Sequence, residues 1–300
     1  MKPPAFAYHA PPDLDTAVDL LAELGEDGKV LAGGQSLVPM MNLRLATPAA
    51  LVDISRLGEL GDLEVADDAV TLGAGVTSER LRTDDTATAA IPLLRQALDH
   101  VAHPVIRNRG TAVGSLVHAD PAAELPAVLA LLDGSVVLRS RDGTRRVVGS
   151  ELFLGPLESD VRPEELATEV VFPIPPARTG TAFHELARRH GDYALAGVAV
   201  RVGLDADLRI DTARAAFIGV ADRPVVIDVG AALAGQHHDA LDTADAVGHA
   251  RARLDPRDDI HATGAYRRHL AGVLLGRALE EAARRAATTD PTTPTAEEAT

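Results

Sequence analysis

The chain has 300 residues, no cysteine, and a formal net charge of −15 from 29 basic and 44 acidic side chains. Its length suggests about two domains of roughly 150 residues each, and a hydrophobic share of 46% is enough for folded cores. The missing cysteines exclude disulfides, zinc–thiolate sites and iron–sulfur clusters held by this chain, and the acidic charge argues against nucleic-acid binding.

Membrane insertion and secretion are not expected. No apolar run reaches the roughly 18 residues of a membrane helix, and residues 1–6 lack the apolar segment of a secretory signal. The composition therefore predicts a cytoplasmic protein that mixes helices and strands.

In chain order, apolar spacing and turn residues predict the elements of the first part of the chain. They are a helix at 13–24, a strand at 29–32, a helical stretch at 37–43, strands at 51–54 and 70–76, a helix at 91–101 and a loop at 103–115. The second part is predicted in the same way. It has a helix at 121–132, a hairpin at 135–148, a linker at 174–180, strands at 194–202 and 210–220, a helix at 263–287, and a disordered tail at 288–300.

Two glycine-containing turns are the candidate binding elements. The first comprises Ala32, Gly33, Gly34, Gln35, Ser36 and Leu37, between a strand and a helical stretch. The second comprises Thr111, Gly114 and Ser115 and leads toward Asp120. Glycines let backbone N–H groups approach an anion, and a helix start favours negative charge. Two such turns suit a ligand with two linked phosphates, although each alone is more often an ordinary turn.

Other sites are not predicted. The sequence has no P-loop and no complete dinucleotide-binding fingerprint. His237 and His238 are adjacent in a loop-like stretch and are expected to be solvated, so no metal site is predicted. Asp120 before Pro121 is also a good helix N-cap, and Tyr193 has the ordinary alternative of a core or interface aromatic side chain.

Taken together, three segments resemble the flavin-binding medium subunits of molybdenum hydroxylases, in the aerobic carbon-monoxide dehydrogenase branch of the xanthine dehydrogenase family. They are 32–37, 108–126, and the C-terminal pattern of 259–262 and 266–270. The resemblance runs from about Phe6 to about Ala287. It implies an α+β fold, with a two-part FAD-binding domain of the vanillyl-alcohol-oxidase (PCMH) type at 1–56 and 57–176, followed by an α+β domain at 177–287.

The resemblance also implies residue roles. Residues 32–37 would wrap the pyrophosphate of a non-covalent FAD, and Thr111, Gly114 and Ser115 would hold its other side. Asp120 would bind the ribityl chain, and Tyr193 would lie near the isoalloxazine ring. No catalytic residue is implied on this chain. Family members often have glycine at the position of Val113, where a valine with positive φ would be strained.

The implied activity is that of an FAD-dependent oxidoreductase subunit. It would take electrons from [2Fe-2S] clusters of a small partner subunit and pass them to NAD, a quinone or another acceptor. Hydroxylation would occur on a large partner subunit with the molybdenum cofactor, in a dimer of heterotrimers. Two alternatives remain: a self-contained flavin oxidoreductase of the same fold, and a scaffold subunit that has lost FAD, for which Val113 would be the sign.

Overall fold

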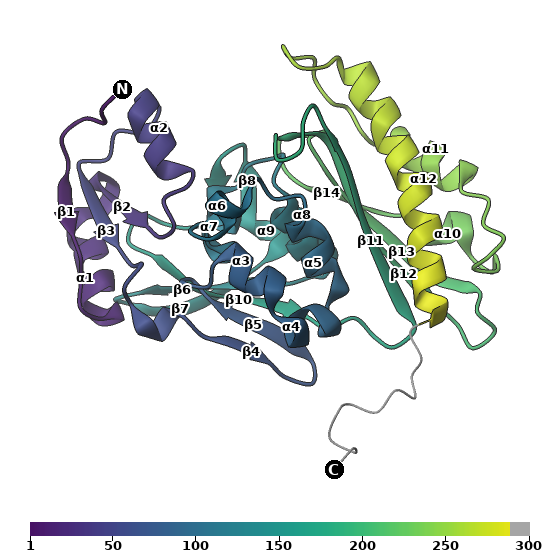
Figure 1. Ribbon diagram of the computed structural model, residues 1–300, viewed down its shortest axis with the longest axis horizontal. Coiled ribbons are helices and arrows are strands. Elements are labelled where there is room, and N and C mark those ends of the chain that lie inside the picture. The colour runs from purple at the N-terminus through teal and green to yellow at the C-terminus, as the bar shows by residue number, and fades with distance from the viewer. Residues whose placement is uncertain (289–300) are drawn as a thin grey trace.

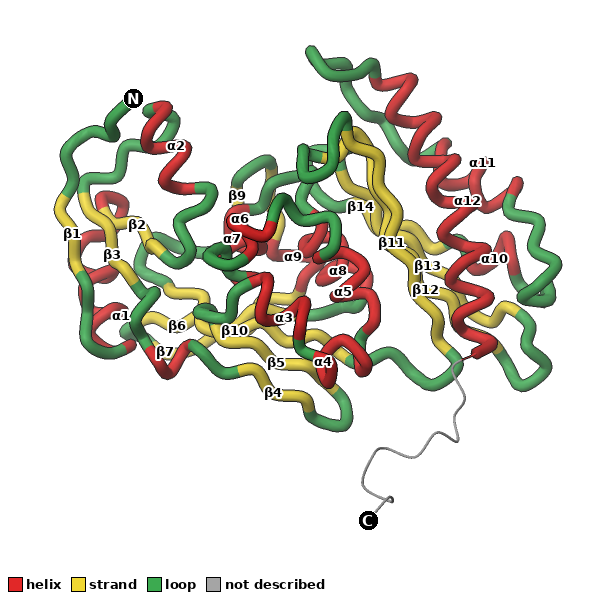
Figure 2. The backbone as a smooth tube through the Cα atoms, in the orientation of Figure 1, coloured by secondary structure: helices red, strands yellow, loops and turns green. Residues whose placement is uncertain are grey.

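A computed structural model describes residues 1–288. Three larger sheets follow one another along the chain, and Figure 1 shows them side by side along the long axis. Helices and strands alternate in every part (Figure 2), which confirms the predicted α+β class. Of the tail predicted at residues 288–300, Thr288 belongs to the last helix, and residues 289–300 lie outside the described residues.

The N-terminal part is a small parallel sheet of strand order β1-β3-β2, flanked by helices. Its elements are β1 (Ala7–His9), α1 (Leu14–Leu24), the 3₁₀ turn Gly25–Asp27, β2 (Gly28–Leu31), α2 (Leu37–Leu43) and β3 (Ala50–Asp53). α1 begins where Asp13 accepts a 2.8 Å hydrogen bond from the N–H of Thr16 and ends at Gly25, whose φ is +53°. The carboxyl end of β2 therefore opens directly into the first glycine turn.

The middle part is an antiparallel sheet of order β4-β5-β10-β6-β7, with helices packed on it. Its strands are β4 (Leu63–Val65), β5 (Ala69–Gly73), β6 (Ser135–Ser140), β7 (Gly143–Val148) and β10 (Leu166–Pro173), with the small hairpin β8 (Phe153–Gly155) and β9 (Glu158–Ser159). Its helices are the 3₁₀ turn Gly58–Leu60, α3 (Ser78–Thr83), α4 (Asp85–Ala90), α5 (Pro92–Leu98), α6 (Pro104–Arg107), α7 (Ala112–His118), α8 (Glu124–Leu131) and α9 (Gly149–Leu152).

The C-terminal part is an antiparallel sheet with helices on both faces. Its elements are β11 (Thr179–Ala187), β12 (Ala194–Leu204), β13 (Ile210–Ile218), β14 (Val225–Asp228), α10 (Gly230–Leu233), α11 (Ala244–Arg251) and α12 (Gly264–Thr288). α12 packs closely on β11, since a Cβ atom at Gly180 would lie 1.9 Å from the carbonyl oxygen of Ala282. The opposite face packs against α5 and α8 of the middle part.

Two apolar cores follow from this arrangement. The first joins the N-terminal and middle parts and reaches Phe183 and Ile218 of the C-terminal sheet. The second lies between that sheet and α12. The predicted boundaries at 56/57 and 176/177 fall between the three sheets, and we retain this three-part division as a proposal.

Two sequence predictions were wrong in this region. Residues 103–115 are not a loop, because they contain α6 and the start of α7. The helix predicted at 121–132 begins only at Glu124, so Pro121 is not its first residue and Asp120 is not its N-cap. Instead, the Asp120 side chain accepts a 2.8 Å hydrogen bond from the N–H of Ala122 in a turn before the helix.

Candidate functional site

The first glycine turn presents a row of free backbone donors. Within residues 1–288, the N–H groups of Gly33, Gly34, Gln35 and Ser36 donate to no protein acceptor. Gly34 has a φ of +70°, which a side chain would disfavour, and the Gln35 amide donates to the carbonyl of Gly33 at 3.0 Å. Consecutive unpaired N–H groups just before a helix form an anion-binding concavity.

The second turn is the beginning of α7. The Thr111 hydroxyl caps this helix by accepting from the N–H of Gly114 at 3.1 Å, and the Thr111 carbonyl accepts from the N–H of Ser115 at 3.1 Å. Val113 lies inside the helix, is absent from the positive-φ residues, and is 2% exposed in the first core. The valine is therefore unstrained, and Val113 does not support the alternative of a scaffold subunit that has lost FAD.

The fold brings the two turns into contact. A Cβ atom at Gly33 would lie 2.0 Å from the carbonyl oxygen of Arg109, so only glycine permits this approach. A Cβ atom at Gly114 would lie 4.0 Å from the Cβ of Ala32. The turns share a cleft of about 650 Å³, and nine of the predicted residues line it: Ala32, Gly33, Gly34, Gln35, Ser36, Leu37, Thr111, Gly114 and Ser115.

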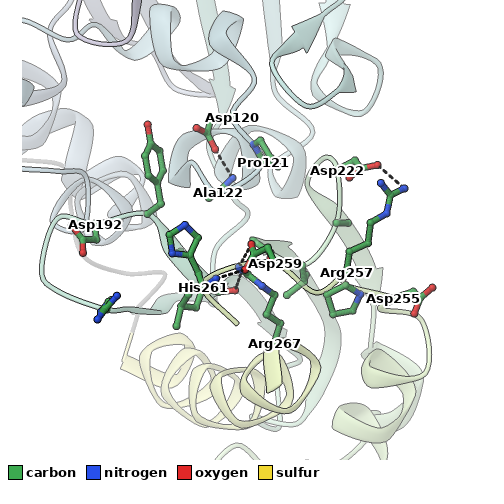
Figure 3. A pocket seen from close by; sticks show the side chains of 18 of the residues that line it. Asp120, Pro121, Ala122, Asp192, Asp222, Asp255, Arg257, Asp259, His261 and Arg267 are labelled. Carbon is green, nitrogen blue, oxygen red and sulfur yellow. Dashed lines mark hydrogen bonds and ion pairs between the residues drawn. The ribbon is translucent and has the colours of Figure 1, made fainter. Parts of the chain in front are cut away.

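The other two predicted residues, Asp120 and Tyr193, line a second cleft of about 970 Å³. This cleft lies where the turn before α8 meets the C-terminal part (Figure 3). Tyr193 is 70% exposed, so it is not a core aromatic of this chain, and the alternative of an interface aromatic stays open. Partial burial, followed by the carboxylates of Asp120 and Glu124, raises the pKa of the Tyr193 phenol.

A residue to which the sequence assigned no role organises the wall of the second cleft. The guanidinium of Arg267 is buried and donates to the carbonyls of Leu195 at 2.6 Å and Gly219 at 2.9 Å. It also donates to Asp259 at 2.6 Å, and this bond is the main reason that the pKa of Asp259 falls to about 2 (Figure 3). Arg267 therefore fixes the start of β12, just after Tyr193, against the end of β13.

A second hydrogen bond links this wall to the Asp120 turn. The N–H of Gly219 donates to the carbonyl of Pro121 at 2.9 Å.

His118, at the end of α7, lines the first cleft, and burial is the main cause that lowers its pKa. The sequence placed Arg267 in a recognisable pattern but carried no signal that this side chain points into the sheet.

Family models match almost the whole chain. Residues 4–175 match the FAD binding domain in molybdopterin dehydrogenase, and residues 181–282 match the CO dehydrogenase flavoprotein C-terminal domain. The chain belongs to this family of FAD-binding subunits of molybdenum hydroxylases, as its sequence motifs indicated. Its fold is accordingly the PCMH-type FAD-binding domain followed by the flavoprotein C-terminal domain.

Characterised relatives match over nearly their full length. The chain is 39% identical to subunit alpha of the 6-hydroxypseudooxynicotine dehydrogenase complex of Paenarthrobacter nicotinovorans, over 95% of this chain and 97% of the relative. It is 37% identical to the carbon monoxide dehydrogenase medium chain of Afipia carboxidovorans, over 95% and 99%. The structure of quinoline 2-oxidoreductase from Pseudomonas putida superposes with a TM-score of 0.90 at 36% identity, over 95% and 99%.

The residues present fit the FAD of this family. Its pyrophosphate needs closely spaced donors, and the first turn supplies four unpaired N–H groups beside the helix start at Thr111. Its ribityl chain carries hydroxyls, for which the carboxylate of Asp120 is a suitable acceptor. Among residues 1–288, no helix is both long and apolar enough to cross a membrane.

Proposed function

We propose that this chain is the FAD-carrying electron-transfer subunit of a molybdenum hydroxylase complex. The observation that carries the proposal is the meeting in one cleft of the first glycine turn, with its four unpaired N–H groups, and the start of α7 at Thr111. Residues 32–37 would wrap the diphosphate from one side, and Thr111, Gly114 and Ser115 would hold the other. Asp120 would bind the ribityl hydroxyls, and Tyr193 would lie near the isoalloxazine ring.

The division of labour that we propose for such a complex rests on the family resemblance and agrees with the composition of this chain. When bound, FAD supplies redox chemistry that links one-electron carriers to two-electron acceptors. This chain has no cysteine, so it offers no thiolates for iron–sulfur clusters. Its own residues bind and orient the flavin. The clusters would lie on a small partner subunit and the molybdenum cofactor on a large one, where the substrate is hydroxylated.

The names of relatives support a multi-subunit assembly. One is a medium chain, and another is subunit alpha of a dehydrogenase complex. We extend this to a dimer of heterotrimers in the cytoplasm, with electrons leaving this subunit for NAD, a quinone or another acceptor.

Visible spectra of the full chain, alone and with added FAD, test the proposal. We expect saturable, non-covalent flavin uptake, and its loss in Gly34→Leu and Gly114→Leu. Gly248→Ala is the matched control, because no atom lies within 4 Å of the added Cβ. Circular dichroism checks that each variant is folded. A folded wild-type chain that carries no flavin, alone or co-purified with its partner subunits, would contradict the proposal.

A further inference from the structure

The connection between α10 and α11 gathers three metal-ligating side chains far from the glycine turns in sequence. His237, His238 and Asp239 each offer one ligand atom, and these atoms all lie within 4.8 Å of one another. The Nδ1 atom of His237 lies 2.5 Å from Oδ1 of Asp239, and the two imidazole rings have centroids 4.7 Å apart. None of the three residues lines either cleft described above.

The imidazole of His238 has a ring nitrogen that forms no hydrogen bond within the described chain. Its Nδ1 atom is buried and has no hydrogen-bond partner among residues 1–288, whereas the neighbouring His237 side chain is 39% exposed. A buried polar atom without a partner destabilises the fold, and native structures seldom leave one without a reason such as an ion. A metal ion bound through Nδ1 would give this atom the partner that it lacks.

The backbone of this connection is held in place before any ion binds. The N–H of His238 donates to the carbonyl of Leu208 at 3.1 Å, and the N–H of Ala240 donates to the carbonyl of His237 at 3.1 Å. The N–H of Asp242 donates to the Gln236 side chain at 2.7 Å. Ligands on a fixed turn lose little freedom on binding, which favours affinity.

We propose that His237, His238 and Asp239 bind one first-row divalent transition-metal ion, with zinc as the representative ion. Two imidazoles and one carboxylate are ligands suited to zinc and to its neighbours in the first transition row. Metal–ligand bonds of about 2.0–2.2 Å place tetrahedral ligand atoms roughly 3.4 Å apart. The His237–Asp239 contact must therefore open by about 1 Å, which the half-exposed side chains allow.

The charge around the site sets its strength. The carboxylate of Asp239, whose Oδ1 lies 2.5 Å from Nδ1 of His237, is the one acidic ligand of the three. Arg209 donates at 2.7 Å to the carbonyl of Gly235, which lies on the same connection. Its positive charge opposes that of a bound cation. The bound ion would cross-link the turn between α10 and α11.

Calorimetric titration of the untagged full chain with zinc chloride in metal-free buffer tests this site. We expect one strongly bound ion per chain at about pH 7.5. The double variant His237→Ala/His238→Ala should bind zinc roughly 100-fold more weakly. His249→Ala, an exposed histidine of α11, is the matched control and should bind as the wild type does.

Two further readouts separate a defined site from surface binding. Cobalt bound by the wild type should show visible absorption bands that the double variant lacks. The conservative Asp239→Asn variant should keep the fold and lose roughly tenfold in zinc affinity. Equal zinc affinity in the wild type and the folded double variant would overturn the proposal, whatever the outcome for FAD.

Discussion

Gly33 is the residue at which the two turns of the first cleft touch, so its replacement by alanine tests how closely they must approach. A Cβ atom at this position would lie 2.0 Å from the carbonyl oxygen of Arg109 and 2.7 Å from the Cα of Gly110. Real Cβ atoms do not come within 3.0 Å of such atoms. One of the two backbones must therefore move by about 1 Å.

A displacement of this size removes N–H donors from the 2.7–3.2 Å range of a hydrogen bond. Each lost hydrogen bond to a charged group costs about 1.5–3 kcal/mol. We therefore expect Gly33→Ala to raise the dissociation constant for FAD roughly 10- to 150-fold. The crowding itself should lower the free energy of unfolding by about 1–3 kcal/mol.

The assay is a titration of the folded variant with FAD, followed by flavin fluorescence, with urea unfolding measured in parallel. Gly248→Ala should bind FAD as the wild type does, because its Cβ meets no atom within 4 Å. If Gly33→Ala bound FAD within about threefold of the wild type, the close approach of the turns would not matter for binding. The reasoning about this junction would then be refuted.

Three other predictions concern the helix start, the second cleft and a titrating carboxyl. Thr111→Val removes the hydroxyl that accepts from the N–H of Gly114 and should destabilise by about 1 kcal/mol in urea unfolding. Arg267→Met leaves three acceptors without their donor and should lower the free energy of unfolding by about 3 kcal/mol or more. Its control is Arg257→Met, at a side chain that is 84% exposed, which should lower the free energy of unfolding by less than about 0.5 kcal/mol. Burial raises the pKa of Glu124 from 4.5 to about 8. The folded state holds this proton more tightly than the unfolded state, so wild-type stability should fall as the pH rises from about 4.5 to 8, by at most about 1.4 kcal/mol per pH unit. Unfolding curves of Glu124→Gln should show a weaker fall.

Each of these predictions has its own contrary result. Thr111→Ser keeps the cap, so equal losses in the serine and valine variants would contradict the capping role. Equal losses for Arg267→Met and Arg257→Met would contradict the clamp at the second cleft. Identical pH dependence for Glu124→Gln and the wild type would show that the Glu124 carboxyl keeps the same pKa when the chain unfolds.

Features set by local sequence were predictable. α1 begins after Asp13 and ends at Gly25, as the cap residues and the spacing of Leu14, Val18 and Leu21 indicate. α2 has the predicted bounds Leu37–Leu43. The first glycine turn was predictable because glycine and hydroxyl residues between regular elements mark close backbone approach. The second segment was predicted as a turn, but Gly114 and Ser115 lie in the first part of α7.

Features set by tertiary contacts were not predictable. α6 and α7 are four and seven residues long, too short for apolar periodicity to show. Asp120 and Pro121 carry a good helix-start signature, but the Asp120 side chain stabilises a separate turn and the helix begins three residues after Pro121. The burial of Arg267 depends on carbonyls 72 and 48 residues away, which no local pattern encodes.

If the first glycine turn and the start of α7 hold the diphosphate of FAD, three ligands should bind the chain with very different affinities. The full chain should be titrated calorimetrically with FAD, riboflavin and ADP. Riboflavin lacks the phosphates, so the account predicts that FAD binds at least roughly 100-fold more tightly than riboflavin. ADP should compete with FAD, and Gly34→Leu should remove the preference for FAD over riboflavin. Equal affinity for FAD and riboflavin, unchanged in Gly34→Leu, would contradict the account.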